Sequence, residues 1–308
     1  MKLHCLNIKL GIVLAAGFVS TPAMAWVKLS EWKKPKVFGL SPSADTASIN
    51  STMQNAGSGE NSISMNKTSS SVLALYPMLD NLVAGFNFGG SVGEIKSIPT
   101  PAGNRGMKTS GSWLELAALY AFNDNISVYF SPGMSSKRSS AEGKETRENF
   151  ASLTTYGVYA IDDNVGLGLG LSARRNTRSQ TVIPLVGGAW QASPDVRIDG
   201  WLPANVHARW KLGEGQAVFA RLELAGESAL SEGIITDSKT EVQLLGGQFL
   251  IGYSIGTLIG FGTGAVRIDP SIGFYKGQLS QTNVSSGSKS EKSTGLNPLA
   301  DVRIAVAF

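Results

Sequence analysis

Apolar and polar residues alternate with a period of two along most of this chain, and the alternation is clearest in its last ten residues, Leu299–Phe308. A period of two places successive side chains on opposite faces of a β-strand. The apolar face of this segment, which either a soluble core or lipid could cover, is formed by Val302, Ile304, Val306 and Phe308.

Segments of about ten residues with strand character recur at a regular pace, as tilted membrane strands do. They predict an all-β fold, a transmembrane antiparallel up-and-down β-barrel of 14 strands, or of 12 if doubtful pairs are merged. The first strand has the weakest pattern. The predicted strands are Val37–Asn50, Ser62–Tyr76, Asn81–Gly93, Ser110–Phe122, Ile126–Ser136, Asn149–Ile161, Val165–Arg175, Val182–Gln191, Val196–Leu202, Asn205–Leu212, Ala217–Ala229, Thr240–Tyr253, Val266–Leu279 and Leu299–Phe308.

The connections between these strands are of two kinds. Short turns rich in Asx or Gly, such as Asn123–Asn125, Asp162–Asn164 and Gly213–Gly215, alternate with longer polar loops. Outer-membrane barrels show this asymmetry, with short periplasmic turns and long outer loops, and Phe308 falls on the side of the short turns. The predicted loops are Ser51–Asn61, Ile95–Thr109, Lys137–Arg147, Ser231–Lys239 and Thr282–Asn297.

The first 25 residues have the three parts of a secretory signal peptide. Lys2 and Lys9 give a basic start, an apolar run follows, and Ala23-Met-Ala25 is an A-x-A cleavage site. Cys5 lies inside this leader, so the mature chain has no cysteine, which excludes disulfides and cysteine–metal sites. The predicted organisation is a signal peptide over 1–25, a periplasmic tail over 26–36 and a barrel domain over 37–308.

Composition agrees with a strand protein that faces lipid. Only 16% of the 308 residues are charged, below the usual share of about 25%, and 36 are glycine. Without the two lysines of the leader, 25 basic residues stand against 23 acidic ones. That small excess gives no field for a polyanion, so nucleic acid is not an expected partner.

The terminal segment resembles the C-terminal assembly signal of bacterial outer-membrane β-barrels, which ends in Phe after apolar residues at every second position. This resemblance implies a location in the outer membrane of a Gram-negative type of bacterium. It also implies contact with outer-membrane lipid and lipopolysaccharide. Periplasmic chaperones and the outer-membrane barrel-insertion machinery would be its assembly partners.

A second resemblance covers Pro184–Leu212 (PLVGGAWQASPDVRIDGWLPANVHARWKL). A Gly-containing strand, a turn and a strand ending in a Leu-Pro step precede the next hairpin, and this plan is similar to that of a family of uncharacterised bacterial outer-membrane β-barrel proteins. With the general plan, the resemblance covers most of the mature chain. It implies an architecture, and no catalytic or ligand residue is carried over from it.

Charged residues within the predicted strands fall on the face opposite to the apolar one. A charge on the lipid face costs a few kcal/mol at mid-membrane, so these side chains are predicted to line the lumen. Their signs balance, which is typical of a salt-bridged interior, whereas a selective pore usually has one sign in excess. The predicted lumen set is Glu115, Arg197, Asp199, His207, Arg209, Lys211, Arg221, Glu223, Glu241, Arg267, Asp269, Asp301 and Arg303.

The stretch Val242–Val266 allows another interpretation, because it has no charge over 25 residues and could span a membrane as a helix. Its seven glycines would weaken a helix, so the sequence favours a strand, a turn near Ile255–Gly260 and a second strand. With Glu241 assigned to the lumen, Val242 and Leu244 fall on the lipid face.

The hairpin around Pro203 would bring lumen residues together. If it paired residues whose numbers sum to 408, Asp199 would lie opposite Arg209, and Trp201 opposite His207. Opposite charges on directly paired residues are favourable.

Candidate catalytic chemistry is sparse. His207 is the only histidine after the leader, and outer-membrane lipases and deacylases need a His–Ser pair that no motif provides here. The sequence has no spacing for a metal site, and its Gly-rich runs lack the strand–loop–helix context of a nucleotide loop, so no cofactor is predicted. The chain is predicted not to be an enzyme. The first hypothesis for its function is porin-like transport of small solutes through a polar lumen. The alternative is a closed structural or surface-interaction barrel acting through its outer loops.

Overall fold

The computed structural model describes residues 47–56, 64–79, 81–100, 103–123, 125–162, 164–176, 180–232, 239–258 and 265–307. The predicted leader (1–25) and tail (26–36), and Phe308, lie outside these ranges. The strands are β1 (Ala47–Ala56), β2 (Ser64–Leu79), β3 (Leu82–Thr100), β4 (Gly103–Ala121), β5 (Ile126–Ala141), β6 (Lys144–Ala160), β7 (Val165–Arg175), β8 (Gln180–Ser193), β9 (Val196–Leu202), β10 (Asn205–Gly213), β11 (Gln216–Glu232), β12 (Lys239–Leu258), β13 (Ala265–Asn283) and β14 (Lys289–Ala307).

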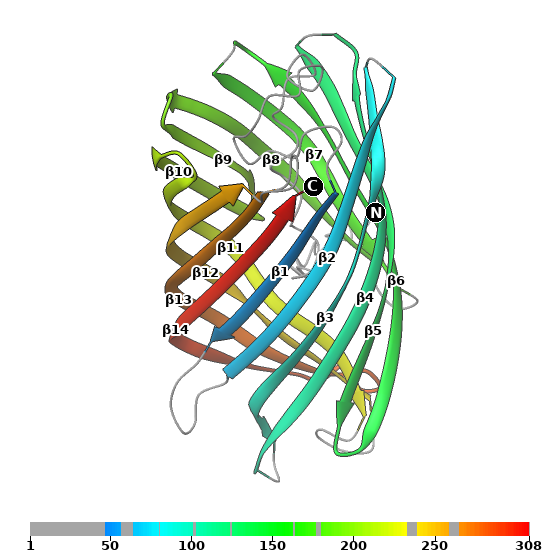
Figure 1. Cartoon of the computed structure of the whole chain (residues 1–308). Helices are drawn as coiled ribbons and strands as arrows, with labels where there is room; N and C mark the ends of the chain where they lie inside the picture. The colour runs from blue at the N-terminus through cyan, green and yellow to red at the C-terminus, as the bar shows by residue number, and fades with distance from the viewer. Residues whose placement is uncertain are drawn as a thin grey trace, which may run out of the picture.

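These 14 strands form one closed antiparallel barrel in which each strand pairs with its neighbours in sequence (Figure 1). The barrel closes where β1 pairs with β14, with Ile49 opposite Val306 and Met53 opposite Val302. The predicted fold class is therefore confirmed. Among the described residues, no helix has the length and apolar character needed to cross a membrane.

The first strand lies later in the chain than predicted. Residues 51–56, assigned to a loop, continue β1, and residues 37–46 of the predicted strand lie outside the described ranges. The segment ASINSTMQNA has no regular apolar alternation that could locate it. Its position follows from backbone hydrogen bonding, because β1 is paired along its length with both β2 and β14.

The strands are also longer than the predicted ten residues, and nine of them have 16 to 20. Much of the predicted long loops is therefore paired strand: β3 runs to Thr100 and β4 begins at Gly103, and β14 begins at Lys289. A tilted strand needs about 9–11 residues to cross a bilayer core, so these hairpins extend beyond it. The stretch predicted as strand, turn and strand is β12 and β13, with residues 259–264 outside the described ranges.

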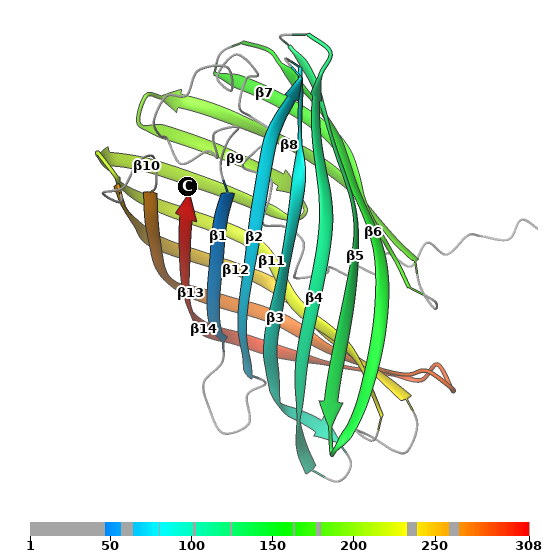
Figure 2. The ribbon, with the colours of Figure 1, turned by 45° about the vertical axis from the view of Figure 1, so that its right-hand side comes forward.

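The two ends of the barrel differ. We call the end that carries the β2–β3, β4–β5, β6–β7, β8–β9, β10–β11 and β12–β13 connections, together with Ala307, the turn end, and the opposite end the far end. The corresponding parts of the barrel are the turn half and the far half. In Figures 1 and 2 the far end lies at the bottom, where the long hairpins project.

Side-chain polarity reverses between the two halves. In the turn half, outward side chains are large and apolar, such as Phe86, Leu169 and Ile272, which are 41%, 68% and 73% exposed. In the far half, polar residues occupy outward positions, such as Lys108 on β4 and Lys276 on β13, although Leu296 is also exposed there. The turn half therefore has the surface of a membrane-spanning band, and the far half has the surface of a water-exposed β-structure.

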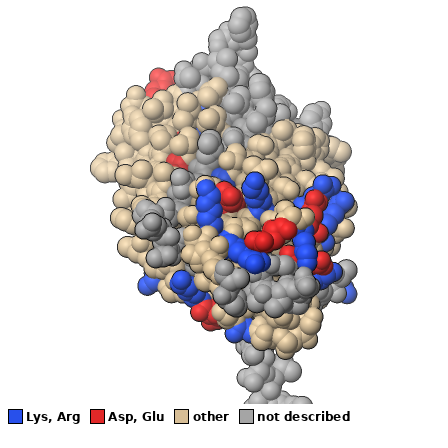
Figure 3. Space-filling model, turned by 90° about the horizontal axis from the view of Figure 1, so that it is seen from below, with Lys and Arg blue, Asp and Glu red and all other residues tan. Residues whose placement is uncertain are grey.

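The far-end surface is rich in charge of both signs, and Lys and Arg side chains lie beside Asp and Glu side chains when it is seen from below (Figure 3). Exposed ion pairs include Lys96–Glu94 at 3.3 Å and Lys239–Glu232 at 3.1 Å. Such pairs stabilise a protein little, but they keep the protruding hairpins hydrated.

Candidate functional site

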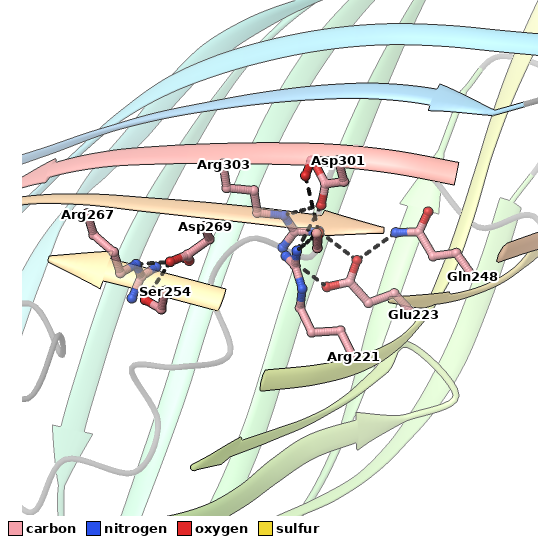
Figure 4. A network of polar contacts seen from close by, with 9 residues as sticks. Arg221, Glu223, Gln248, Ser254, Arg267, Asp269, Asp301 and Arg303 are labelled. Carbon is pink, nitrogen blue, oxygen red and sulfur yellow. Dashed lines mark hydrogen bonds and ion pairs between the residues drawn. The ribbon is translucent and has the colours of Figure 1, made fainter. Parts of the chain in front are cut away.

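A network of charged side chains crosses the lumen-facing surfaces of β11, β12 and β14 in the turn half (Figure 4). We call its five members the charged belt. They are Arg221 and Glu223 from β11, Gln248 from β12, and Asp301 and Arg303 from β14.

Cations and carboxylates alternate within the charged belt. Arg221 Nη2 lies 2.9 Å from Asp301 Oδ2, and Arg303 bridges Asp301 at 3.1 Å and Glu223 at 2.7 Å. The Gln248 amide donates to Glu223 at 2.7 Å. Asp301 is fully buried and Arg221 is 5% exposed, so each charge depends on its partners to offset the cost of leaving water.

The period of two explains why these side chains meet. Arg221 and Glu223 are two residues apart, as are Asp301 and Arg303, so each pair projects from one face of its strand. The antiparallel register places Glu223 opposite Gln248. Ser271, on β13 between β12 and β14, accepts a hydrogen bond from Arg221 at 3.0 Å.

Two smaller pairs lie nearer the turn end. Arg267 and Asp269 of β13 are 3.0 Å apart, and the Ser254 hydroxyl donates to Asp269 at 2.6 Å (Figure 4). On β9, Arg197 lies 3.3 Å from Asp199. Both ion pairs join residues that are two apart on one face of their strand.

Glu115 of β4 lies apart from these groups, on another part of the wall. It is 8% exposed and accepts a hydrogen bond from the Asn87 amide of β3 at 3.0 Å. The structure therefore does not bring Glu115 into the charged belt.

The β9–β10 hairpin has a different register from the predicted one. Its paired residues sum to 406, so Asp199 lies opposite His207 and Arg197 opposite Arg209. The predicted Asp199–Arg209 pairing is wrong because the innermost pair is Trp201–Asn205, which centres the hairpin on Pro203 rather than on Ala204.

His207 lies on the lumen side of β10, with its ring 5.8 Å from that of Phe219. It is paired with Arg221 on β11. Lys211, near the turn end of the same strand, is exposed.

Glu241 is the member of the predicted set that the structure turns away from the lumen. Its neighbours Val242 and Leu244 are 0% and 1% exposed, so they point inward and the lipid-facing assignment of both is wrong. Glu241 instead accepts a hydrogen bond from the Gln243 amide at 2.7 Å. The reason is its position in the far half, where water rather than lipid faces the outer surface.

Aromatic rings line the lumen of the turn half on the wall opposite to β12–β14. Tyr156 stacks on Tyr129 with ring centroids 4.7 Å apart, and Trp201 lies 4.4 Å from Tyr156. The indole of Trp201 rests on glycines, since a Cβ on Gly168 or Gly187 would collide with it. The side-chain-poor face of β7 is therefore the surface on which these rings pack.

A buried apolar cluster, which we call the apolar core, lies inside the barrel, mainly in the far half. It joins β2–β5 to β12–β14, and its members are at most 3% exposed. They are Met65, Ile95, Ile98, Met107, Ala141, Val242, Leu244, Leu250, Tyr275, Leu279 and Leu299.

Strands that are not neighbours also meet at the far end. Leu230 of β11 donates its backbone N–H to Glu148 of β6 at 3.2 Å, and its carbonyl accepts from Ser139 of β5. Gln281 of β13 donates to the Pro99 carbonyl of β3 at 3.0 Å. Opposite walls of the barrel are thus in contact, and Figure 2 shows the far ends of β11–β14 reaching the side of β3–β6.

Three lumen-facing cations in the far half were missed by the sequence analysis. Lys67 lies in a polar run without alternation, and Lys137 was assigned to a loop. Arg174 could have been found, because it continues the lumen face of β7 beyond Gly170 and Ser172. The residues described contain no group of three or more His, Cys, Asp or Glu that could hold a metal ion.

A closed antiparallel barrel with an even number of strands, an apolar outer band and charged inward side chains defines the class of this protein. It is a bacterial outer-membrane β-barrel. The lipid-facing band also explains why so many large apolar side chains are exposed along alternate positions of the turn half.

No protein-family model matches the sequence, and no curated protein matches it either. Among solved structures, the chain is similar to the translocator domain of the autotransporter NalP from Neisseria meningitidis (12% identity, 91% of each chain, TM-score 0.41). It is also similar to an outer-membrane channel from Pseudomonas putida F1 (10% identity, 89% of this chain and 100% of that one, TM-score 0.43). The transport unit of AIDA-I from Escherichia coli is a third (10% identity, 88% and 92%, TM-score 0.41). Similarities at this level assign no function, and the fold of this chain rests on its own strand order.

Proposed function

We propose that this outer-membrane barrel passes small solutes through its lumen and that the described conformation is a closed state. The observation that carries the proposal is the contrast between the charged belt in the turn half and the apolar core, which joins β2–β5 to β12–β14. Charged side chains favour water and polar solutes in the turn half. An apolar constriction excludes water and can close a channel until its walls separate.

A closed structural or surface-interaction barrel is the second candidate. It is favoured by the pairing within the charged belt, which neutralises the inward charges of β11 and β14, and by the apolar core, which joins β2–β5 to β12–β14. Its partners would bind the charged far-end hairpins, which in this orientation project from the cell.

The same proposal covers assembly. The turn end would face the periplasm, and the chain would depend on periplasmic chaperones and the barrel-insertion machinery to enter a membrane of lipid and lipopolysaccharide. No catalytic role is assigned, since His207 contacts the ring of Phe219 and lies between strands that carry Asp199 and Arg221.

Single-channel recording in planar bilayers tests the proposal. We expect low, intermittent conductance from the purified wild-type protein and a severalfold longer open time from Leu244→Ser, because a hydroxyl in the apolar core lets water enter it. Leu296→Ser is the matched control, since Leu296 is 66% exposed on the outer surface and should leave conductance unchanged.

Each variant is first shown to be folded by the shift of its gel mobility on heating. If folded wild-type protein and folded Leu244→Ser are both silent at all voltages, solute passage is refuted and the closed barrel stands.

A further inference from the structure

Two arginines face each other across the β9–β10 hairpin in the turn half, and we call them the arginine pair. Arg197 of β9 is paired directly with Arg209 of β10, and Cβ atoms at such positions lie about 4.5–5.5 Å apart. Arg197 shares the lumen face of β9 with the buried Trp201. Arg209 shares the lumen face of β10 with His207, whose ring contacts that of Phe219. Like charges at directly paired positions are destabilising, so this arrangement needs a counter-charge.

Asp199 supplies only part of that counter-charge. Its carboxylate lies 3.3 Å from Nε of Arg197, and its side chain is 15% exposed. Within the part of the chain that the structure describes, the guanidinium of Arg209 forms neither an ion pair nor a hydrogen bond. Two guanidinium groups therefore share one carboxylate, and the net charge of these three residues is about +1.

The residues beside the arginine pair in the same row of the sheet carry no charge. Gln191 of β8 lies opposite Arg197, and Phe219 of β11 lies opposite Arg209. The Gln191 amide donates to the Val196 carbonyl at 3.2 Å, within its own hairpin. Neither neighbour supplies a counter-charge, and the ring of Phe219 gives the site an apolar side.

The charges around this row cancel one another. Arg267 and Asp269 of β13 are ion-paired at 3.0 Å. At the turn end, the backbone N–H of Lys211 donates to the Asp195 carbonyl at 2.8 Å, which places a cation beside a carboxylate. In the charged belt, two cations stand against two carboxylates. The excess positive charge of the arginine pair is therefore not offset by its surroundings.

Guanidinium groups bind carboxylate and phosphate oxygens through a planar fork of N–H donors. An anion between Arg197 and Arg209 would remove their repulsion and accept hydrogen bonds from both. We propose that the arginine pair is a binding site for the carboxylate or phosphate group of a small solute, near the turn end of the lumen. This rests on the proposed function and deepens it by naming the charge of the solute, although binding itself does not require passage.

Urea unfolding of the full mature protein in lipid vesicles tests the site, with inorganic phosphate compared against chloride at equal ionic strength. We expect phosphate to raise the urea midpoint of the wild type, because a ligand of the folded state stabilises it. Arg209→Gln should show no such rise. In chloride alone, this variant should be at least as stable as the wild type, because it removes a contact between like charges. A purely structural role for Arg209 predicts the reverse, a lower midpoint in both salts.

Isothermal titration with inorganic phosphate measures the affinity of protein refolded in detergent. We expect one saturable site that Arg209→Gln weakens roughly tenfold or more, because a charge-assisted contact is lost. Arg138→Gln is the matched control, since Arg138 is 57% exposed in the far half, and its phosphate affinity should equal that of the wild type. Equal affinities of wild type and Arg209→Gln, or the absence of saturable binding, would overturn the site.

Planar-bilayer recording of the same preparations separates the site from solute passage. Phosphate binding by folded protein that never conducts would keep the site and refute solute passage. Conductance without phosphate binding would refute the site and keep solute passage.

Discussion

The turn half and the far half of this barrel use the same alternation with opposite polarity. In the turn half, Ile272 points outward and is 73% exposed, while Asp301 points inward and is fully buried. In the far half, Leu244 points inward and is 1% exposed, while Lys276 lies on the outer surface. The period of two fixes which residues share a face, and the medium outside decides whether the outer face is apolar or polar. Lipid surrounds one half and water the other.

The largest expected effect comes from breaking the inward charges of the turn half. Asp301→Leu leaves Arg221, which is 5% exposed, without its closest carboxylate. We expect the free energy of unfolding in lipid vesicles, measured by urea titration, to fall by about 3–5 kcal/mol. Arg138→Met, which removes an exposed far-half pair with Glu145 at 3.7 Å, should cost no more than about 1 kcal/mol.

The double variant Asp301→Leu/Arg221→Met distinguishes the cost of an unpaired buried charge from the cost of altered side-chain packing. Because both charges are removed, most of the stability should return. Equal losses in the single and double variants would show that the charged belt is not a coupled network.

The outer surface gives the next effect. Ile272→Lys places a charge in the lipid-facing band and should destabilise the barrel by roughly 2–4 kcal/mol in vesicles. Gln278→Lys is the matched change on the same strand and face in the far half, beside Glu291, and should be nearly neutral. Similar costs at the two positions would mean that lipid covers both halves and would overturn the comparison.

The alternation predicted the fold because a closed antiparallel barrel needs only strands, the turns between them and an even number of strands. It could also assign the inward charges of the turn half, where a charge cannot face lipid. The same rule fails for Glu241, since a charge can face outward wherever water is outside. No pattern in the sequence marks the residue at which β12 leaves the bilayer.

Other features depend on contacts that no local pattern carries. The position of β1 is set by hydrogen bonds to β2 and β14, and its own sequence has no regular apolar alternation. The glycine-rich face of β7 is visible in the sequence, but the Trp201 ring that covers it comes from β9. The pairing of Asp199 with His207 depends on whether the hairpin is centred on Pro203 or on Ala204, and strand boundaries read from a pattern are not precise to one residue.

The smallest expected effect tests most directly whether the outer surface changes from apolar to polar between the turn half and the far half. Glu241→Leu removes a carboxylate that accepts a hydrogen bond from the neighbouring Gln243 amide, on a surface where water can replace it. Its free energy of unfolding should stay within about 0.5 kcal/mol of the wild type. Glu223→Leu makes the same substitution in the charged belt, where Arg303 lies 2.7 Å away and the buried Arg221 4.0 Å away. It should cost several kcal/mol because both guanidinium groups lose a carboxylate partner. A large loss at Glu241 would place it inside the lumen after all, and the reversal of polarity between the halves would then be wrong at β12.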